Sequence, residues 1–298
     1  GRQVVVLVPT TLLARQHFEN FRDRFADTAV NISLISRFTG GKEMTQTLEG
    51  IKSGQTDIVI GTHKLLSKSV ELPKMGLLII DEEHRFGVAQ KEKLKTLRAE
   101  IDILTLTATP IPRTLNMAMS GIRDLSIIAT PPARRLSVKT FIQQRDNSII
   151  KEALLREILR GGQVYFLHNE VETIENRRAA LEQLLPEARI AVAHGQMPES
   201  QLEQTMIDFA EGKMDVLLCT TIIESGIDMP TVNTLVVDRA DLLGLGQLHQ
   251  LRGRVGRAGQ RAYAYLFTPP DKALSEQAHE RLRPIGETTE LGSGLRIA

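Results

Sequence analysis

The most constraining stretch of this sequence is residues 77–84, which read Leu-Leu-Ile-Ile-Asp-Glu-Glu-His. Four aliphatic residues run without alternation into polar ones, which is typical of a strand buried on both faces at the centre of a parallel sheet. Ligands of open α/β sheets bind at the carboxyl ends of the strands, so we expect these carboxylates to face a ligand. Asp81 would hold Mg²⁺ through water, and Glu82 would orient or deprotonate an attacking water. The competing interpretation is an acidic loop after a core strand.

Apolar runs alternate with helical periodicities along the chain, which predicts βαβ units and parallel sheets. Two prolines within residues 129–135 indicate a linker. We therefore expect two α/β domains, residues 1–131 and 132–270, with a ligand cleft between them. The predicted strands are 4–8, 31–35, 57–60, 77–80, 102–106, 138–142, 164–167, 189–193, 216–219, 234–237 and 262–267. The predicted helices are 10–25, 42–52, a Lys- and Glu-rich segment after Phe86, 148–159 and 172–185.

Composition excludes several classes of protein. With 298 residues, 42% of them hydrophobic, the chain is expected to fold as soluble globular domains. We find no signal peptide and no apolar run near the ~20 residues that span a bilayer, so no membrane contact is expected. Cys219 is the only cysteine, which fits a cytoplasmic protein without disulfides. The net charge of +1 neither predicts nor excludes nucleic acid, while the absence of Trp argues against base stacking.

A second polar segment, residues 247–257, contains three arginines and two glycines. Arg254 and Arg257 are expected on one helical face, and the glycines would let a ligand approach closely. Guanidinium groups match phosphate oxygens and stay charged at any relevant pH. Asp81 and Glu82 in one domain would hold Mg²⁺ and water, while the arginines of the other domain would neutralise charge on a transferring phosphoryl group, an effect of ~10³ to 10⁵ in rate. A solvated basic helix end is the alternative.

Small or hydroxyl-bearing residues follow four of the predicted strands. Hydroxyls and free backbone N–H groups at such positions bind phosphates, and their repetition in both domains indicates a track of backbone contacts. Helix caps and ordinary turns remain the alternative, since Thr10 or Thr11 also suits a cap. Gly226 permits a sharp turn that Asp228 would hold. The residues of the predicted track are Thr10, Thr11, Thr62, His63, His194, Gly195, Thr220 and Thr221.

Five segments together resemble successive motifs of the superfamily 2 helicases, in order and spacing, over nearly the whole chain. Residues 81–87 and 107–114 narrow the resemblance to the branch that holds the bacterial transcription-repair coupling factors and RecG. Residues 123–132 resemble the coupling factors more closely. The five segments are 9–16, 81–84, 107–114, 220–230 and 250–257.

The resemblance implies two tandem RecA-like domains that use ATP and Mg²⁺ to move along double-stranded DNA. It assigns Asp81 and Glu82 to the metal and the water, and it makes His84 and residues 107–109 couple nucleotide state to domain closure. RNA polymerase and repair proteins would be partners of the whole protein, through parts outside this chain. The residues that would face the γ-phosphate are Gln250, Arg254 and Arg257, beside Gly226 and Asp228.

One departure from the family is clear, because the sequence contains no Gly-x-x-x-x-Gly-Lys-Ser/Thr phosphate loop. In the family this loop lies just before the strand at Val4, so we expect the chain to start after it. We also expect residues 271–298 to begin a translocation hairpin that is cut short. Three hypotheses follow: the motor core of a translocase that displaces stalled RNA polymerase, a RecG-like remodeller of forks and junctions, or, for this chain alone, a DNA-binding module without turnover. RNA as the substrate also stays open.

Overall fold

The computed structural model divides the chain into two compact units, residues 1–127 and 128–298, and each is described by itself. Among the described residues, no helix is long and apolar enough to cross a membrane. The structure describes residues 1–36, 39–67, 69–83, 86–87, 90, 92, 94, 101–107, 124, 126–128, 136–221, 227–257, 259–270 and 276–287.

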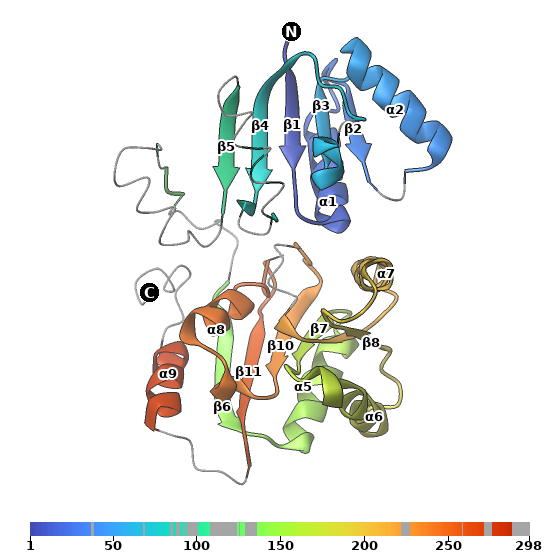
Figure 1. Ribbon diagram of the computed structural model, residues 1–298. Coiled ribbons are helices and arrows are strands. Elements are labelled where there is room, and N and C mark those ends of the chain that lie inside the picture. The colour runs from blue at the N-terminus through green and yellow to red at the C-terminus, as the bar shows by residue number, and fades with distance from the viewer. Residues whose placement is uncertain are drawn as a thin grey trace. The chain divides into compact units, whose positions relative to one another are not determined.

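The N-terminal unit is built on a five-stranded parallel sheet with the strand order β2-β3-β1-β4-β5 (Figure 1). Helix α1 packs over β2 and β3, and α2 contacts β2. The described elements are β1 (Gln3–Leu7), α1 (Thr11–Arg24), β2 (Ile32–Ile35), α2 (Gly41–Ser53), β3 (Ile58–Gly61), the 3-10 helix η1 (His63–Leu66), β4 (Met75–Asp81) and β5 (Asp102–Leu106).

Alternate side chains of the central strand β1 enter two separate apolar clusters. Val6 packs with Leu13 of α1, whereas Val5 packs with Ile51 of α2. This alternation follows from the two-residue period of a strand. The two helices therefore cover opposite faces of the sheet, as parallel sheets require.

The prediction for the strand before Asp81 is partly wrong. Strand β4 lies inside the sheet, but β1 occupies its centre. Leu78 and Ile80 are fully buried, whereas Leu77 and Ile79 on the other face are only partly buried. The unbroken apolar run therefore contributes to both faces but buries one of them more fully, since Ile79 packs only partly buried against the cluster on the α1 side. The length of the run did not show whether the strand was central or merely internal.

The C-terminal unit contains a six-stranded parallel sheet with the order β6-β11-β10-β7-β9-β8 (Figure 1). Helix α5 packs on β7 and β10, α6 and α7 both contact β8, and α9 contacts β6 and α8. The elements are β6 (Lys139–Gln144), α5 (Asn147–Leu159), β7 (Gln163–Leu167), η3 (Val171–Thr173), α6 (Ile174–Leu184), β8 (Ile190–Ala193), α7 (Glu199–Ala210), β9 (Val216–Cys219), β10 (Val232–Val237), η5 (Ala240–Leu242), α8 (Leu245–Arg252), β11 (Tyr263–Thr268) and α9 (Glu276–Glu287).

All eleven predicted strands are present within two residues of their expected bounds, and the predicted α/β architecture is confirmed. The linker at 129–135 and most of the helix expected after Phe86 lie outside the described residues. Residues 276–287 form α9, which packs within the C-terminal unit. The hairpin expected from 271–298 stays a prediction.

Candidate functional site

The acidic pair lies at the carboxyl end of β4. Asp81 is the last residue of the strand, and Glu82 follows it with a φ of 53°, the one positive φ of a non-glycine residue in the described part of the chain. The backbone N–H of Glu82 donates to the Leu106 carbonyl of β5 at 2.9 Å. Its side chain is 6% exposed. A left-handed backbone is costly for a residue with a Cβ, so the neighbouring strand fixes this turn.

A histidine that the sequence reasoning missed contacts the acidic pair. His17 Nε2 lies 3.1 Å from Asp81 Oδ2, and both side chains are partly buried. His17 is on α1, 64 positions away in the sequence, so no local pattern connects the two residues. The available signal was topological: α1 begins after the strand beside β4, and its side chains can therefore reach the end of β4.

The acidic pair suits a magnesium ion that keeps most of its water. The described residues contain no cluster of three or more carboxylates, histidines or cysteines that would form a complete metal cage. Mg²⁺ commonly binds through one or two carboxylates plus water and phosphate oxygens. Asp81 is partly exposed at the end of a strand, with only one of its oxygens engaged by His17. Asp81 and Glu82 therefore fit the cation without further protein ligands.

The predicted track residues of the N-terminal unit follow β1 and β3, which are neighbouring strands. Thr10 caps α1, since its Oγ1 accepts a hydrogen bond from the Leu13 N–H at 3.3 Å. Thr11 and Thr62 are buried, whereas His63 is exposed at the start of η1. The cap interpretation of Thr10 is therefore confirmed. Its hydroxyl hydrogen stays available to another acceptor.

The arginine segment does not continue as a helix, so the prediction of one helical face is wrong. Helix α8 ends at Arg252, and Gly253 closes it with its N–H bonded to the His249 carbonyl. Arg254 and Arg257 lie in the following loop, where Gly256 has a φ of 76°. Gly253 at the helix end keeps a right-handed φ of −67°, and the left-handed angle comes only later in the loop, at Gly256. Glycine has a low helix propensity, so the two glycines of the segment were a sequence signal against a continuous helix.

The loop brings Arg257 against Asp228. Arg257 Nη1 lies 3.1 Å from Asp228 Oδ1, and the Nε of Arg257 is buried with no hydrogen-bond partner among the described residues. Burial raises the pKa of Tyr165 on β7, and the charges of Arg257 and Arg254 partly offset this rise. The unpartnered N–H of Arg257 suits an anionic ligand.

Arg252, the remaining arginine of the segment, has a structural position. It is buried, and its Nη1 donates to the Ile285 carbonyl in the last turn of α9 at 3.0 Å. Burial lowers the pKa of Arg252. The contact satisfies a carbonyl that the helix end leaves without an intrahelical partner. Gln250 is partly buried in the last turn of α8.

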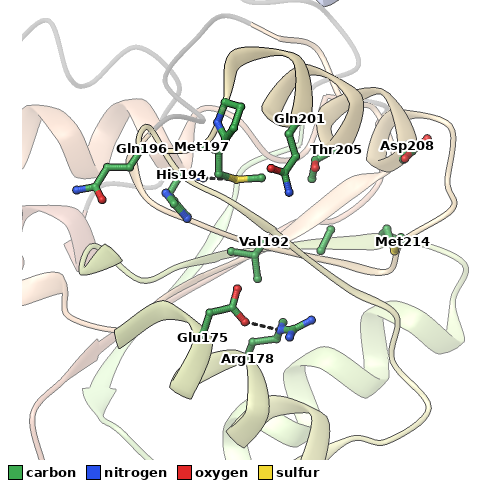
Figure 2. Close-up of a pocket in the computed structure, with 12 residues that line it drawn as sticks. Glu175, Arg178, Val192, His194, Gln196, Met197, Gln201, Thr205, Asp208 and Met214 are labelled. Atoms are coloured by element: carbon green, nitrogen blue, oxygen red, sulfur yellow. Dashed lines mark hydrogen bonds and ion pairs between the residues drawn. The ribbon is translucent and has the colours of Figure 1, made fainter. Parts of the chain in front are cut away.

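The predicted track residues of the C-terminal unit follow β8 and β9, which pair with each other. Thr220 is buried and its N–H donates to the Ala193 carbonyl at 3.2 Å, whereas Thr221 is partly buried. His194 lines a hollow of about 500 Å³ between α6 and α7, beside Gln196 (Figure 2). Its Nδ1 is buried and lacks a hydrogen-bond partner within the described ranges. Gly195 follows it with open space around its Cα.

A buried ionic cluster at the same edge of the C-terminal sheet was not predicted. Asp238 is 1% exposed and accepts from His168 Nδ1 at 2.8 Å, while Arg177 Nη2 lies 2.7 Å away. Arg145 approaches the second carboxylate oxygen at 3.7 Å. Burial alone would raise the pKa of Asp238, but the hydrogen bond from His168 and the two arginine charges hold it below its usual value. Asp238 and His168 directly follow β10 and β7. Polar residues directly after a strand were the sequence signal for Asp81 and for the track residues, and the same signal was present here.

Two predicted site residues, His84 and Gly226, lie outside the described residues. The others fall into two groups. Asp81 and Glu82 share an edge of the first sheet with Thr10, Thr11 and Thr62, while Arg257 pairs with Asp228 in the second unit. Arg254 lies in the same loop as Arg257. The predicted cleft between the domains stays a prediction.

Comparison with known families matches both units. The family described as DEAD/DEAH box helicase matches residues 1–118, and the helicase conserved C-terminal domain matches residues 147–259. The chain belongs to the superfamily 2 helicases. Both matches follow the two parallel-sheet units of the structure, which correspond to tandem RecA-like domains.

The relatives of this helicase chain are much longer proteins. It is 62% identical over 297 residues to the transcription-repair-coupling factor of Haemophilus influenzae, and 61% identical to that of Escherichia coli K12. In both cases the match covers 100% of this chain and 26% of the relative. A solved structure of RecG bound to a three-way DNA junction is 34% identical, with a TM-score of 0.83, and is matched over 39% of its length. The chain thus spans about a quarter of the coupling factors that it matches.

Proposed function

We propose that this chain is the motor core of an ATP-dependent double-stranded DNA translocase that acts in transcription-coupled repair by displacing stalled RNA polymerase. The identity of 62% to a coupling factor over the whole chain supports this proposal. Contacts with RNA polymerase and repair proteins would belong to other parts of the whole protein. ATP closes the two units in this scheme, and hydrolysis reopens them.

The residues of the first unit bind the cation and activate water. Asp81 would hold Mg²⁺ through water, and Glu82 would accept a proton from the attacking water or orient it. Bound Mg²⁺ supplies positive charge that neutralises the phosphate oxygens. The observation that carries this assignment is the backbone of Glu82, whose φ of 53° is fixed by a hydrogen bond to β5. Residues held in costly backbone conformations cluster at functional sites.

The residues of the second unit stabilise charge. Arg254 and Arg257 donate to the γ-phosphate, with Gln250 and Asp228 beside them. The buried Nε of Arg257, which has no hydrogen-bond partner among the described residues, would be a further donor for this purpose. Arginines in this role contribute ~10³ to 10⁵ in rate, because charge develops on the transferring group.

DNA would bind through its phosphates at the loops that follow the strands. Hydroxyl and backbone contacts position the duplex without reading its sequence. Thr10, Thr11, Thr62 and His63 would contribute from the first unit. The second unit would contribute His194, Gly195, Thr220 and Thr221.

A second candidate is a RecG-like remodeller of forks and junctions, favoured by the TM-score of 0.83 and 34% identity to RecG. A third applies to these 298 residues alone, which contain no phosphate loop and would bind DNA without turnover. The two enzymatic candidates use the same residues in the same roles. They differ in the substrate on which movement is productive.

The experiment that separates the first two candidates uses a chimera in which this chain replaces its counterpart in the Haemophilus influenzae coupling factor. One assay measures release of a stalled RNA polymerase from duplex DNA, and the other measures unwinding of a three-way junction. We expect ATP-dependent polymerase release and little junction unwinding. Efficient junction unwinding without polymerase release would favour the RecG-like candidate, and inactivity in both assays would contradict the proposal.

A further inference from the structure

The contact between His17 and Asp81 links a helix to the end of a neighbouring strand within the first unit. His17 Nε2 lies 3.1 Å from Asp81 Oδ2. An ionised carboxylate only accepts hydrogen bonds, so the Nε2 of His17 carries the hydrogen and donates it. Within the described part of the chain, no hydrogen bond reaches the second oxygen of Asp81, so its lone pairs can serve another partner.

Helix α1 holds His17 firmly in this position. Its first turn, residues 11–14, is buried, and Leu13 and Ala14 pack in the apolar cluster on that face of the sheet. Thr10 caps the helix, and the ring of Phe21 meets the His17 imidazole edge-on with centroids 6.4 Å apart. The imidazole is therefore oriented from both sides, by the carboxylate and by an aromatic ring.

We propose that His17 is a positioning residue that fixes the Asp81 carboxylate for the metal ion, an inference that rests on the proposed function of Asp81. His17 does not touch the cation or the substrate. It engages one oxygen, which sets the rotation of the carboxylate and leaves the other oxygen directed to the hydrated ion.

The chemistry of Mg²⁺ makes this orientation important. The ion demands nearly octahedral geometry and gives up water reluctantly, so a carboxylate that binds through water must present its oxygen in one direction. Hydrogen bonds to metal-binding carboxylates provide that direction, and their loss typically costs ~10- to 100-fold in metal affinity. Asp81 is 20% exposed, so without His17 its side chain would have room to rotate.

A purely structural contact would behave differently. Both groups are partly exposed, and such pairs contribute little to stability. Loss of a structural contact would leave metal affinity unchanged. Metal affinity is therefore the measurement that distinguishes positioning from packing.

The experiment titrates the 298-residue chain with Mn²⁺, a paramagnetic substitute for Mg²⁺, and determines the free ion by electron paramagnetic resonance. His17→Leu removes the donor, and His17→Gln places an amide N–H near the position of Nε2. His17→Asn carries the same amide on a shorter side chain that cannot reach Asp81. Asn20→Leu, an exposed position on the same helix, is the matched control, and Asp81→Asn identifies the site.

We expect Asp81→Asn to abolish the specific Mn²⁺ site and His17→Leu to weaken it by ~10- to 100-fold. His17→Gln should restore affinity to near the wild-type value, whereas Asn20→Leu should not change it. If His17→Leu fails to fold, the comparison of His17→Gln with His17→Asn gives the same test, with weaker binding expected only for His17→Asn.

Wild-type affinity in both His17→Leu and His17→Asn would overturn the inference and leave the role of Asp81 intact. A different outcome would test the proposed function itself. If Asp81→Asn binds Mn²⁺ as the wild type does, Asp81 is not the metal carboxylate, and both proposals fail.

Discussion

Replacing Asp238 by Asn should destabilise the C-terminal unit by about 3 kcal/mol at neutral pH. The carboxylate is 1% exposed and lies between His168 and two arginines, so its removal leaves buried positive charge without compensation. Breaking a buried ion pair from one side typically costs ~3 to 5 kcal/mol. The lower end applies here because Arg145 is 34% exposed and remains partly solvated. Urea unfolding, monitored by far-ultraviolet circular dichroism, measures the change.

The pH dependence of this loss has a defined sign. The pKa of Asp238 is lowered in the folded protein, so its stabilisation is present above the unfolded pKa of about 3.9. It is lost as the pH falls through the lower folded pKa. The difference between Asp238→Asn and the wild type should therefore be full at neutral pH and shrink in strongly acidic solution.

Asp208→Asn is the matched control, because it removes a partly exposed carboxylate, 27% exposed, that pairs with the exposed Lys213 in the same unit. Its unfolding midpoint should stay near that of the wild type, since exposed ion pairs contribute little. Equal midpoints for Asp238→Asn and Asp208→Asn at neutral pH would refute the reasoning. A difference that grows on acidification would refute the assigned direction of the pKa.

Three further outcomes are expected. Phosphate release from ATP by the purified 298-residue chain should stay at background with duplex DNA present, because the sequence has no phosphate loop; DNA-stimulated turnover would contradict this. In the chimera, Thr221→Ala should weaken DNA binding to every duplex sequence alike without changing the salt dependence of that binding. Thr10→Ala should lower the free energy of unfolding by about 1 kcal/mol, because it removes the cap of α1. Lost stability with unchanged DNA affinity in Thr221→Ala would make Thr221 a cap instead. Gly256→Ala should lower the free energy of unfolding by ~1 to 2 kcal/mol, because Gly256 has a φ of 76° and the new Cβ would lie 2.8 Å from the Cβ of Ala262. Gly246→Ala in α8, where an added Cβ meets open space, should leave stability unchanged. Equal unfolding midpoints for the two variants would contradict the predicted strain at Gly256.

The sequence predicted the sheets well because buried parallel strands leave a strong local signal. The strand at 216–219 matched the structure to the residue, Asp81 ends β4, and Thr62, Thr220 and His194 follow strands as expected. Strand order was harder to predict, since β4 and β1 have similar apolar runs and only their pairing shows which is central. Local composition carries little information about that pairing.

The parts of the site that the sequence did not predict depend on contacts between distant elements. His17 reaches Asp81 across 64 positions, and Asp238 joins His168, Arg177 and Arg145 from four separate segments. The prediction of a helix through residues 253–257 was wrong for a local reason and not because of distant contacts. The helix ends at Gly253, and the spacing of the arginines alone does not indicate that end.

The central claim is that Glu82 activates water and does not hold the nucleotide. The most direct test is Glu82→Gln in the Haemophilus influenzae chimera, because the amide keeps the shape of the side chain and loses the base. Nucleotide affinity should stay close to that of the unsubstituted chimera, while DNA-stimulated phosphate release should fall by ~10² to 10⁴. A loss of nucleotide affinity as large as the loss of turnover, or turnover that persists, would contradict the account.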